Sequence, residues 1–77
     1  MSIYENIKTA VFEATGKKIR TLDTDFIKDL GLNSLDIVNI VVIIEKKYKI
    51  KIPNRDLWDL HTVRDAIGYL RRRGIAR

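Results

Sequence analysis

The chain contains no cysteine and a single histidine, His61, among its 77 residues. Without thiols it can form neither a disulfide framework nor a thiolate metal site, and it has no cysteine nucleophile. One histidine cannot form a histidine cluster around a metal ion. The sequence therefore predicts no metal site, and it lacks the residues that most self-contained catalysis uses.

Long hydrophobic runs are also missing. The first ten residues, MSIYENIKTA, lack the basic start and the apolar segment of a secretory signal, and no stretch is long enough to span a bilayer. A chain of this length holds one core, close to the size at which burial only just offsets chain entropy. We expect one soluble, cytoplasmic domain over residues 1–77, without linkers or repeats.

Acidic residues are outnumbered by basic ones, which gives a formal net charge of +5. The excess is uneven, because residues 1–20 carry +2, residues 21–36 carry −3 and residues 37–77 carry +6. A basic total invites a nucleic-acid or membrane-surface hypothesis, but the distribution of the charge matters more than its sum. The basic excess lies away from Ser34, which follows the acidic segment. The acidic residues of that segment are Asp23, Asp25, Asp29 and Asp36.

A first helix is predicted over about residues 3–15. Ser2 and Glu5 have the spacing of a capping box, and Gly16 stands where a C-terminal glycine belongs. One face of this helix is apolar, which indicates that it packs on a core. The residues of that face are Ile3, Ile7, Ala10, Val11 and Ala14.

A last helix is predicted from the start and stop signals around residues 62–74. Thr62 and Asp65 form a second capping box, and Gly74 follows three arginines that suit the negative end of a helix dipole. The apolar stripe of this helix consists of Val63, Ala66, Ile67 and Leu70.

Two connecting segments carry apolar residues. Residues 17–33 hold too many of them for a solvated loop, so we expect this connection to pack against the helices. Farther along, Pro53 is a stop signal, Asn54 is a possible cap, and a short helical piece carries Leu57, Trp58 and Leu60. The apolar residues of the first connection are Leu22, Phe26, Ile27, Leu30 and Leu32.

The segment SLDIVNIVVIIEKKYKIKI gives conflicting signals. Seven of the eight residues from Ile37 to Ile44 are β-branched, which by propensity alone predicts a strand. No second strand is available to pair with it, and a lone strand leaves its backbone groups without partners. The helical penalty of about 0.5 kcal/mol per β-branched residue is smaller than the gain from burying two or three such side chains. We therefore predict a helix from Ser34 to about Tyr48, followed by a loop to Pro53.

Ser34 has two competing interpretations within the stretch DLGLNSLDIV. Asn33 is a strong N-cap residue, in which case the Ser34 hydroxyl is free, points outward at the positive end of the helix dipole, and favours a phosphate ester there. Alternatively Ser34 is itself the cap. A serine hydrolase is disfavoured, because GLNSL lacks the second glycine of a nucleophile elbow and no strand precedes it.

The stretch DLGLNSLDIV, preceded by Phe26 and followed by an apolar helix, an Ile-Pro pair and TVRDAIGYL, resembles the acyl carrier protein family. The similarity covers nearly the whole chain in order. It implies an all-α fold, a small four-helix bundle with three main helices and one short helix. It also implies that Ser34 is esterified through phosphate to 4′-phosphopantetheine, beside the helix cap Asn33. The arm ends in a thiol that holds acyl groups as thioesters, so the protein carries cargo and its partner enzymes catalyse.

The resemblance also assigns roles to other residues. An apolar cleft for the acyl chain draws on Phe26, Ile27, Val38, Val41, Ile44, Tyr48, Ile52, Leu57 and Ile67, each of which can equally be plain core. Leu35 and Val42 are expected to be partly exposed on the partner-facing side of the second helix, where Asp36 and Glu45 supply its few acidic groups. The implied partners of this monomeric carrier are a phosphopantetheinyl transferase and acyl-transferring and acyl-modifying enzymes.

Three departures set this chain apart from the usual family pattern. Asn33 stands in place of the aspartate before the serine, the second helix has few acidic residues, and the chain as a whole is basic. These features indicate a specialised carrier for fatty-acid, lipid or polyketide-type synthesis, whose partner enzymes are less basic than usual or present acidic patches.

Other functions remain open from the residues. A peptidyl or D-alanyl carrier has the same fold and arm, and the sequence does not separate these cargo classes. A basic nucleic-acid-binding domain using RRRGIAR and the lysines around Tyr48 is disfavoured, because helix-turn-helix signals are absent. A third possibility is an interaction module with an unmodified Ser34.

Overall fold

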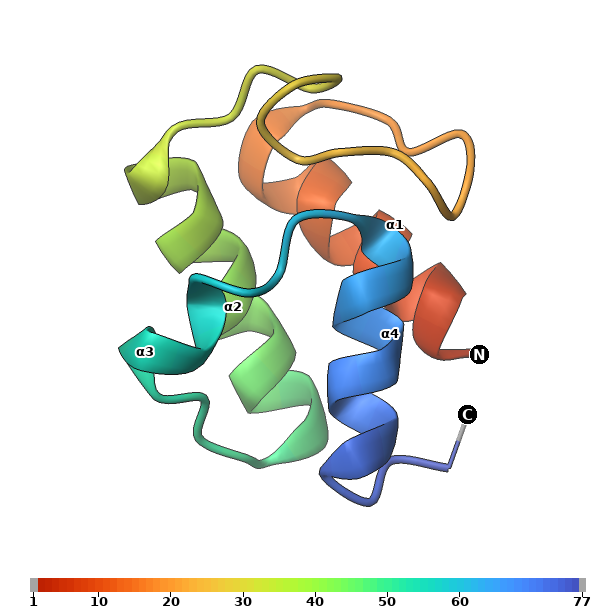
Figure 1. Ribbon diagram of the computed structural model, residues 1–77, viewed down its shortest axis with the longest axis vertical. Helices are drawn as coiled ribbons and strands as arrows, with labels where there is room; N and C mark the ends of the chain where they lie inside the picture. The colour runs from red at the N-terminus through yellow and green to blue at the C-terminus, as the bar shows by residue number, and fades with distance from the viewer. Residues whose placement is uncertain (1, 77) are drawn as a thin grey trace.

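Four helices make up the protein in the computed structural model, which describes residues 2–76. They are α1 (Ile3–Thr15), α2 (Ser34–Tyr48), α3 (Asn54–Leu57) and α4 (Val63–Arg72). Within these residues the only β-type pairing is an isolated bridge between Asp25 and Thr62. The prediction of an all-α domain with three main helices and one short helix is confirmed (Figure 1).

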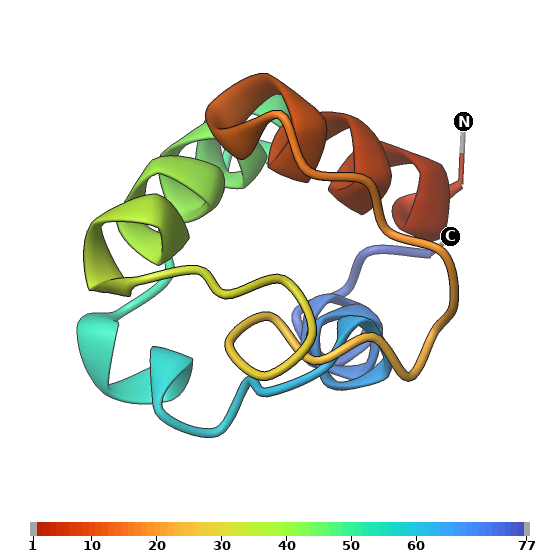
Figure 2. The same cartoon turned by 90° about the horizontal axis from the view of Figure 1, so that it is seen from above.

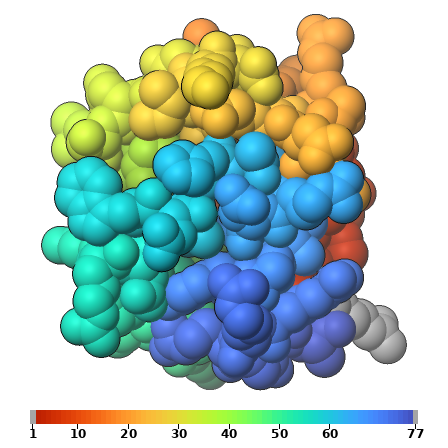
Figure 3. Space-filling model, viewed as in Figure 1, coloured from red at the N-terminus to blue at the C-terminus, as the bar shows by residue number. Residues whose placement is uncertain are grey.

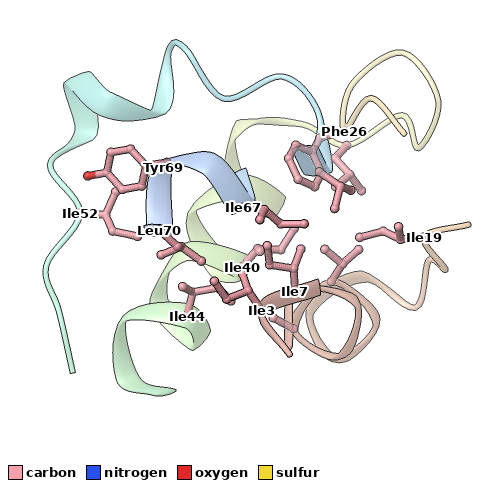
Figure 4. Packing of buried hydrophobic residues seen from close by; sticks show 14 residues of the cluster. Ile3, Ile7, Ile19, Phe26, Ile40, Ile44, Ile52, Ile67, Tyr69 and Leu70 are labelled. Atoms are coloured by element: carbon pink, nitrogen blue, oxygen red, sulfur yellow. The ribbon is translucent and has the colours of Figure 1, made fainter. Parts of the chain in front are cut away.

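The three long helices surround one apolar core. Viewed from above, α1, α2 and α4 lie around the interior, and the connection between α1 and α2 crosses one end of it (Figure 2). Side chains from all three helices and from this connection meet in the centre (Figure 4). They include Ile3 and Ile7 of α1, Ile40 and Ile44 of α2, and Ile67 and Leu70 of α4, together with Ile19 and Phe26 of the connection.

The β-branched segment is helical as predicted, and burial explains why. Ile40 and Ile44, one helical turn apart, are both buried against the core. Each buried side chain of this size contributes roughly 1.5–3 kcal/mol, which outweighs the lower helix propensity of its β-branched neighbours. The alternating residues after Tyr48 form a loop that ends in Pro53, also as predicted.

The end of α2 is held by two features of this loop. Lys49 adopts a left-handed conformation, with φ 57°, and its N–H donates to the Glu45 carbonyl. Three residues later, the Ile52 N–H donates to Glu45 Oε2 at 2.7 Å. Glu45 therefore fixes the path of the chain from α2 toward α3 through both its backbone and its side chain.

The connection between α1 and α2 packs on the start of α4 through backbone hydrogen bonds. The N–H of Phe26 donates to His61 O at 2.9 Å, and that of Val63 donates to Thr24 O at 3.1 Å. Phe26 and Leu32 are buried, which confirms the expected packing, but Ile27 is 56% exposed. The prediction that Ile27 lies inside is wrong, because the neighbouring Phe26 takes the interior position and the turn directs Ile27 outward.

Two predicted caps differ from the observed ones. Ser2 Oγ accepts from the Glu5 N–H at 3.1 Å, but only this half of the expected capping box forms among the described residues. Asn54 is the first residue of α3 rather than its cap; Pro53 occupies the cap position and makes no side-chain bond there. Thr62 and Asp65 form the complete box at α4, and Gly16 ends α1 with φ 75°.

The short helix α3 is attached to α4 by a polar contact. The Tyr69 hydroxyl donates to Asp56 Oδ2 at 2.6 Å and accepts from Arg73 Nη1 at 2.8 Å. Burial raises the pKa of this hydroxyl above its ordinary value of 10.0, and the bond to Asp56 adds to the effect. Trp58, which follows α3, is 79% exposed and adds nothing to the core.

Replacing Lys49 with glycine should stabilise the fold. Glycine adopts positive φ without the Cβ penalty that lysine carries there, so Lys49→Gly is expected to raise the free energy of unfolding by about 0.5–1 kcal/mol in a urea titration. Lys47→Gly, in the last turn of the same helix, is the control and should lower it by a similar amount. A neutral or destabilising Lys49→Gly would show that the left-handed cap carries no strain.

Candidate functional site

Ser34 is the first residue of α2, and its side chain is exposed. Asn33 caps the helix: its Oδ1 accepts from the Asp36 N–H at 2.9 Å. Asp36 Oδ2 accepts in return from the Asn33 N–H at 3.2 Å, which completes a capping box. The prediction that Asn33 is the cap is confirmed, and the alternative in which Ser34 caps the helix is wrong.

The Ser34 hydroxyl is consequently available. Within residues 2–76 no hydrogen bond involves it, and of the first three helical N–H groups only that of Asp36 has a protein partner. The N–H groups of Ser34 and Leu35 therefore point out of the helix end without a partner in the described chain. Free amides and the helix dipole together favour a negative group at this position.

The loop before Ser34 is folded by its own acidic side chains. Asp25 Oδ1 accepts from the N–H groups of Ile27 and Lys28 at 2.9 and 2.8 Å, and Asp29 Oδ2 accepts from the Asp25 N–H at 2.7 Å. The bond from the Lys28 N–H is the main reason that the pKa of Asp25 lies below its ordinary value of 3.8. These bonds order the approach to Ser34 and concentrate negative charge beside it.

The loop closes with a glycine in the left-handed region. Gly31 has φ 67°, and its N–H donates to Ile27 O at 2.9 Å. The Leu32 N–H then donates to Phe26 O at 3.1 Å, and the Leu32 side chain is buried. Anchored by Leu32, the chain enters α2 with Asn33 and Ser34 at the surface.

An exposed apolar stripe runs along α2 from Ser34. Leu35, Val38 and Val42, spaced three and four residues apart, are 68%, 45% and 39% exposed. The expected exposure of Leu35 and Val42 is confirmed. Val38, which was expected to serve the interior cleft, lies on the outer face instead; the helical spacing of these three residues was the signal that could have placed it there.

The two acidic residues expected on the partner-facing side have internal roles. The Asp36 carboxylate belongs to the capping box, and the Glu45 carboxylate accepts from the Ile52 N–H. Both side chains are half-buried. That Asp36 and Glu45 also contact partner enzymes stays a prediction.

The remaining cleft residues lie inside the bundle. Phe26, Ile44, Ile52 and Ile67 are buried, whereas Val41, Tyr48 and Leu57 are half-buried and pack against the same core. Two open grooves, of about 450 and 350 Å³, lie elsewhere, along α1. Of the cleft residues only Ile67 borders either groove, so neither groove corresponds to the predicted acyl cleft.

Comparison with known proteins gives the class first. A family model described as "Phosphopantetheine attachment site" matches residues 5–70, so this is a phosphopantetheine-bearing carrier domain. An acyl carrier protein of Bdellovibrio bacteriovorus is 37% identical over 79 aligned residues, covering 99% of this chain and 100% of that protein. One from Campylobacter concisus is 29% identical and covers 96% of this chain and 99% of its own length. The chain belongs to the acyl carrier protein family.

A solved structure agrees with the fold. The solution structure of a protein named as an acyl carrier protein from Anaplasma phagocytophilum superposes with a TM-score of 0.86 and covers 99% of this chain and 92% of its own. Its sequence identity is 23%, so the likeness concerns the fold alone.

Membership of the family defines the general role. Acyl carrier proteins are carriers and not enzymes; they bear covalently attached 4′-phosphopantetheine and work with phosphopantetheinyl transferases and acyl-handling enzymes. Within residues 2–76, no helix combines the length and apolar character needed to cross a membrane.

Substitutions at the start of α2 test the assigned cap. Asn33→Ala removes the acceptor for the Asp36 N–H and is expected to cost about 1 kcal/mol of unfolding free energy in a denaturant titration. Ser34→Ala removes a hydroxyl that makes no bond in the described chain, and it should leave the midpoint nearly unchanged. The reverse order of the two effects would mean that Ser34 is the cap and that its hydroxyl is engaged.

Proposed function

We propose that this protein carries acyl intermediates as thioesters on a 4′-phosphopantetheine arm attached through phosphate to Ser34. The observation that carries the proposal is that the residues that cap α2 are different from the residue whose hydroxyl is free. Asn33 and Asp36 satisfy the cap, and the Ser34 hydroxyl is left exposed next to two free N–H groups.

The residues at this helix end fit a phosphodiester. A phosphate on Ser34 Oγ lies near the N–H groups of Ser34 and Leu35 and at the positive end of the α2 dipole. The Asp36 carboxylate is nearby, but it is held by the Asn33 N–H at the cap. When bound, the arm supplies the thiol that this cysteine-free chain lacks. The chain's own part is to hold the phosphate at the surface and to offer an apolar interior.

The partner surface in this proposal is the stripe of Leu35, Val38 and Val42 that begins beside Ser34. An enzyme that reaches the arm meets these exposed apolar side chains together with Asn39, and meets Asp36 and Glu45 at the edges of the stripe. With few free charges on this face, contact depends mainly on apolar burial and shape.

The acyl chain enters the core in this proposal, among Phe26, Val41, Ile44, Ile52, Leu57 and Ile67. The segment that can most easily move aside to admit the acyl chain is α3, because it has only four residues, lacks a side-chain cap and has no buried residue of its own. The Tyr69 bond to Asp56 limits how far it moves. Ile27 and Val38, being exposed, are outside this volume.

The proposal includes that the carrier is a monomer in the cytoplasm that serves fatty-acid, lipid or polyketide-type synthesis. The basic surface supports its specialisation. Lys46, Lys47, Lys49 and Lys51 follow the partner stripe directly and are all exposed. Like charges disfavour enzymes whose docking sites are basic. The proposed partner enzymes are therefore less basic than usual or present acidic patches.

Loading of Ser34 can be measured directly. Incubation with coenzyme A and a broad-specificity phosphopantetheinyl transferase is expected to add one phosphopantetheine to the intact protein, seen by mass spectrometry, and none to Ser34→Ala. A control carrier in the same tube shows that the transferase is active. If the folded protein stayed unmodified while the control carrier was modified, the proposal that Ser34 bears the arm would be wrong.

The specialisation is tested by kinetics. A fatty-acid synthase enzyme set that normally uses acidic carriers should elongate this loaded carrier more slowly than an acidic carrier, and added salt should narrow the gap because it screens repulsion between like charges. Turnover equal to that of the acidic carrier at low salt would disprove the specialisation while leaving the carrier function intact.

A further inference from the structure

The positive charges collect at the end of the molecule opposite Ser34. α2 and α4 both begin near the loop that precedes Ser34 and both run toward the opposite end (Figure 1). The segment after α2 and the C-terminal end of α4 form the lower part of the face in Figure 3. We name the cations of these segments, together with those in the last turn of α2, the basic pole. They are Lys46, Lys47, Lys49, Lys51, Arg71, Arg72 and Arg73.

The basic pole is exposed and almost free of opposing charge. All seven side chains belong to exposed residues. Among residues 45–52 and 70–76 the single acidic residue is Glu45, which is half-buried and bonded to the Ile52 N–H. One further carboxylate, that of Asp56, is linked to Arg73 through the Tyr69 hydroxyl. Neither ion pair found within residues 2–76 includes a member of the pole; they join Arg55 with Asp56 and Arg64 with Asp23.

Compensation of helix dipoles does not account for this charge. A helix C-terminus carries about half a negative elementary charge, so one cation at each of α2 and α4 is enough. Lys49 and Lys51 lie beyond the last turn of α2, and Arg73 beyond that of α4. Most of the positive charge of the basic pole is therefore not explained by the helix dipoles.

Distance separates the basic pole from the modification site. The 15 residues of α2 span about 22 Å, whereas the screening length at 0.1 M salt is about 10 Å. At physiological salt the field of the pole is therefore largely screened at Ser34, whose own surroundings are acidic, whereas at low salt it still reaches an enzyme that docks along α2. The two ends of the molecule are suited to two different partners at the same time.

We propose that the basic pole binds the surface of an anionic membrane, with the Ser34 end directed away from it. The cations come from two stretches of the chain, residues 46–51 and 71–73, and only Arg71 among them borders one of the two grooves. Such a spread of flexible charges suits a plane of lipid phosphates better than one shaped site on a protein. Each lysine or arginine near an anionic bilayer strengthens binding about fivefold, so even part of the pole is sufficient for reversible attachment.

Vesicle sedimentation tests this proposal with the full chain. The protein is mixed at low salt with vesicles of phosphatidylcholine alone or of phosphatidylcholine with phosphatidylglycerol. It is expected to sediment only with the second kind, and to be released by added salt. Equal binding to the neutral and anionic vesicles, or binding to neither, would overturn the proposal.

Two matched variants locate the surface. The pole variant replaces Lys46, Lys47, Lys51 and Arg72 with glutamine, and the control variant replaces Lys17, Lys18, Lys28 and Arg20 with glutamine. Both change three exposed lysines and one exposed arginine, so their net charges are equal. The pole variant should lose several hundredfold in binding, and the control variant much less. Equal losses would show that binding follows net charge rather than the pole.

Two further measurements separate membrane binding from loading of Ser34 and from binding of nucleic acid. Ser34→Ala should bind anionic vesicles as well as the unchanged protein does, because the pole acts without the arm; failure of loading and failure of membrane binding are thus distinguishable. In competition, an RNA or DNA duplex should not displace the protein from vesicles at equal phosphate concentration. If the protein moved from the vesicles to the duplex, the membrane proposal would be wrong and nucleic acid would be the partner.

Discussion

The capping box at the start of α2 is the constraint on which the site depends. The first N–H groups of any helix need partners, and a serine in the first turn is an obvious candidate to supply one. Here Asn33 and Asp36 bond to each other's backbone and take that role. The Ser34 hydroxyl is thereby left at the surface, beside N–H groups that favour an anion. If the cap lay one residue later, at Ser34, the hydroxyl that is proposed to bear the arm would be engaged in the cap.

The approach loop and the core place this helix end in space. Leu32 and Phe26 anchor the loop in the interior, and Asp25 and Asp29 bond to its backbone. At the other end of α2, Glu45 bonds to Ile52 and directs the chain to α3. The approach loop and α2 thus hold Ser34 at the surface, while the small helix α3 is tied to Tyr69 by one hydroxyl, and under the proposed function it is the segment through which cargo reaches the interior.

Charge divides the molecule into two ends. The segment before Ser34 is acidic, and the last turns of α2 and α4 are basic. Because the length of α2 exceeds the screening distance in physiological salt, a molecule bound at one end is affected mainly by the charges of that end. A net charge of +5 therefore says little about the chemistry at Ser34.

Local signals in the sequence determined the helices, the candidate serine and some of the caps. Glycine and the Thr62–Asp65 pair act within one turn of chain, so Gly16 and the start of α4 could be assigned without tertiary information, whereas the sequence left open whether Asn33 or Ser34 caps α2. Even the helical state of the β-branched segment followed from the lack of a pairing strand.

Only the tertiary structure decided which apolar side chains face the core. Ile27 and Val38 have the same chemistry as their buried neighbours, and their exposure depends on how the loop turns and how α2 is rotated against α1 and α4. The sequence did not decide that the basic pole forms either, because lysines and arginines 20 or more residues apart meet at one end only when the two helices run in the same direction.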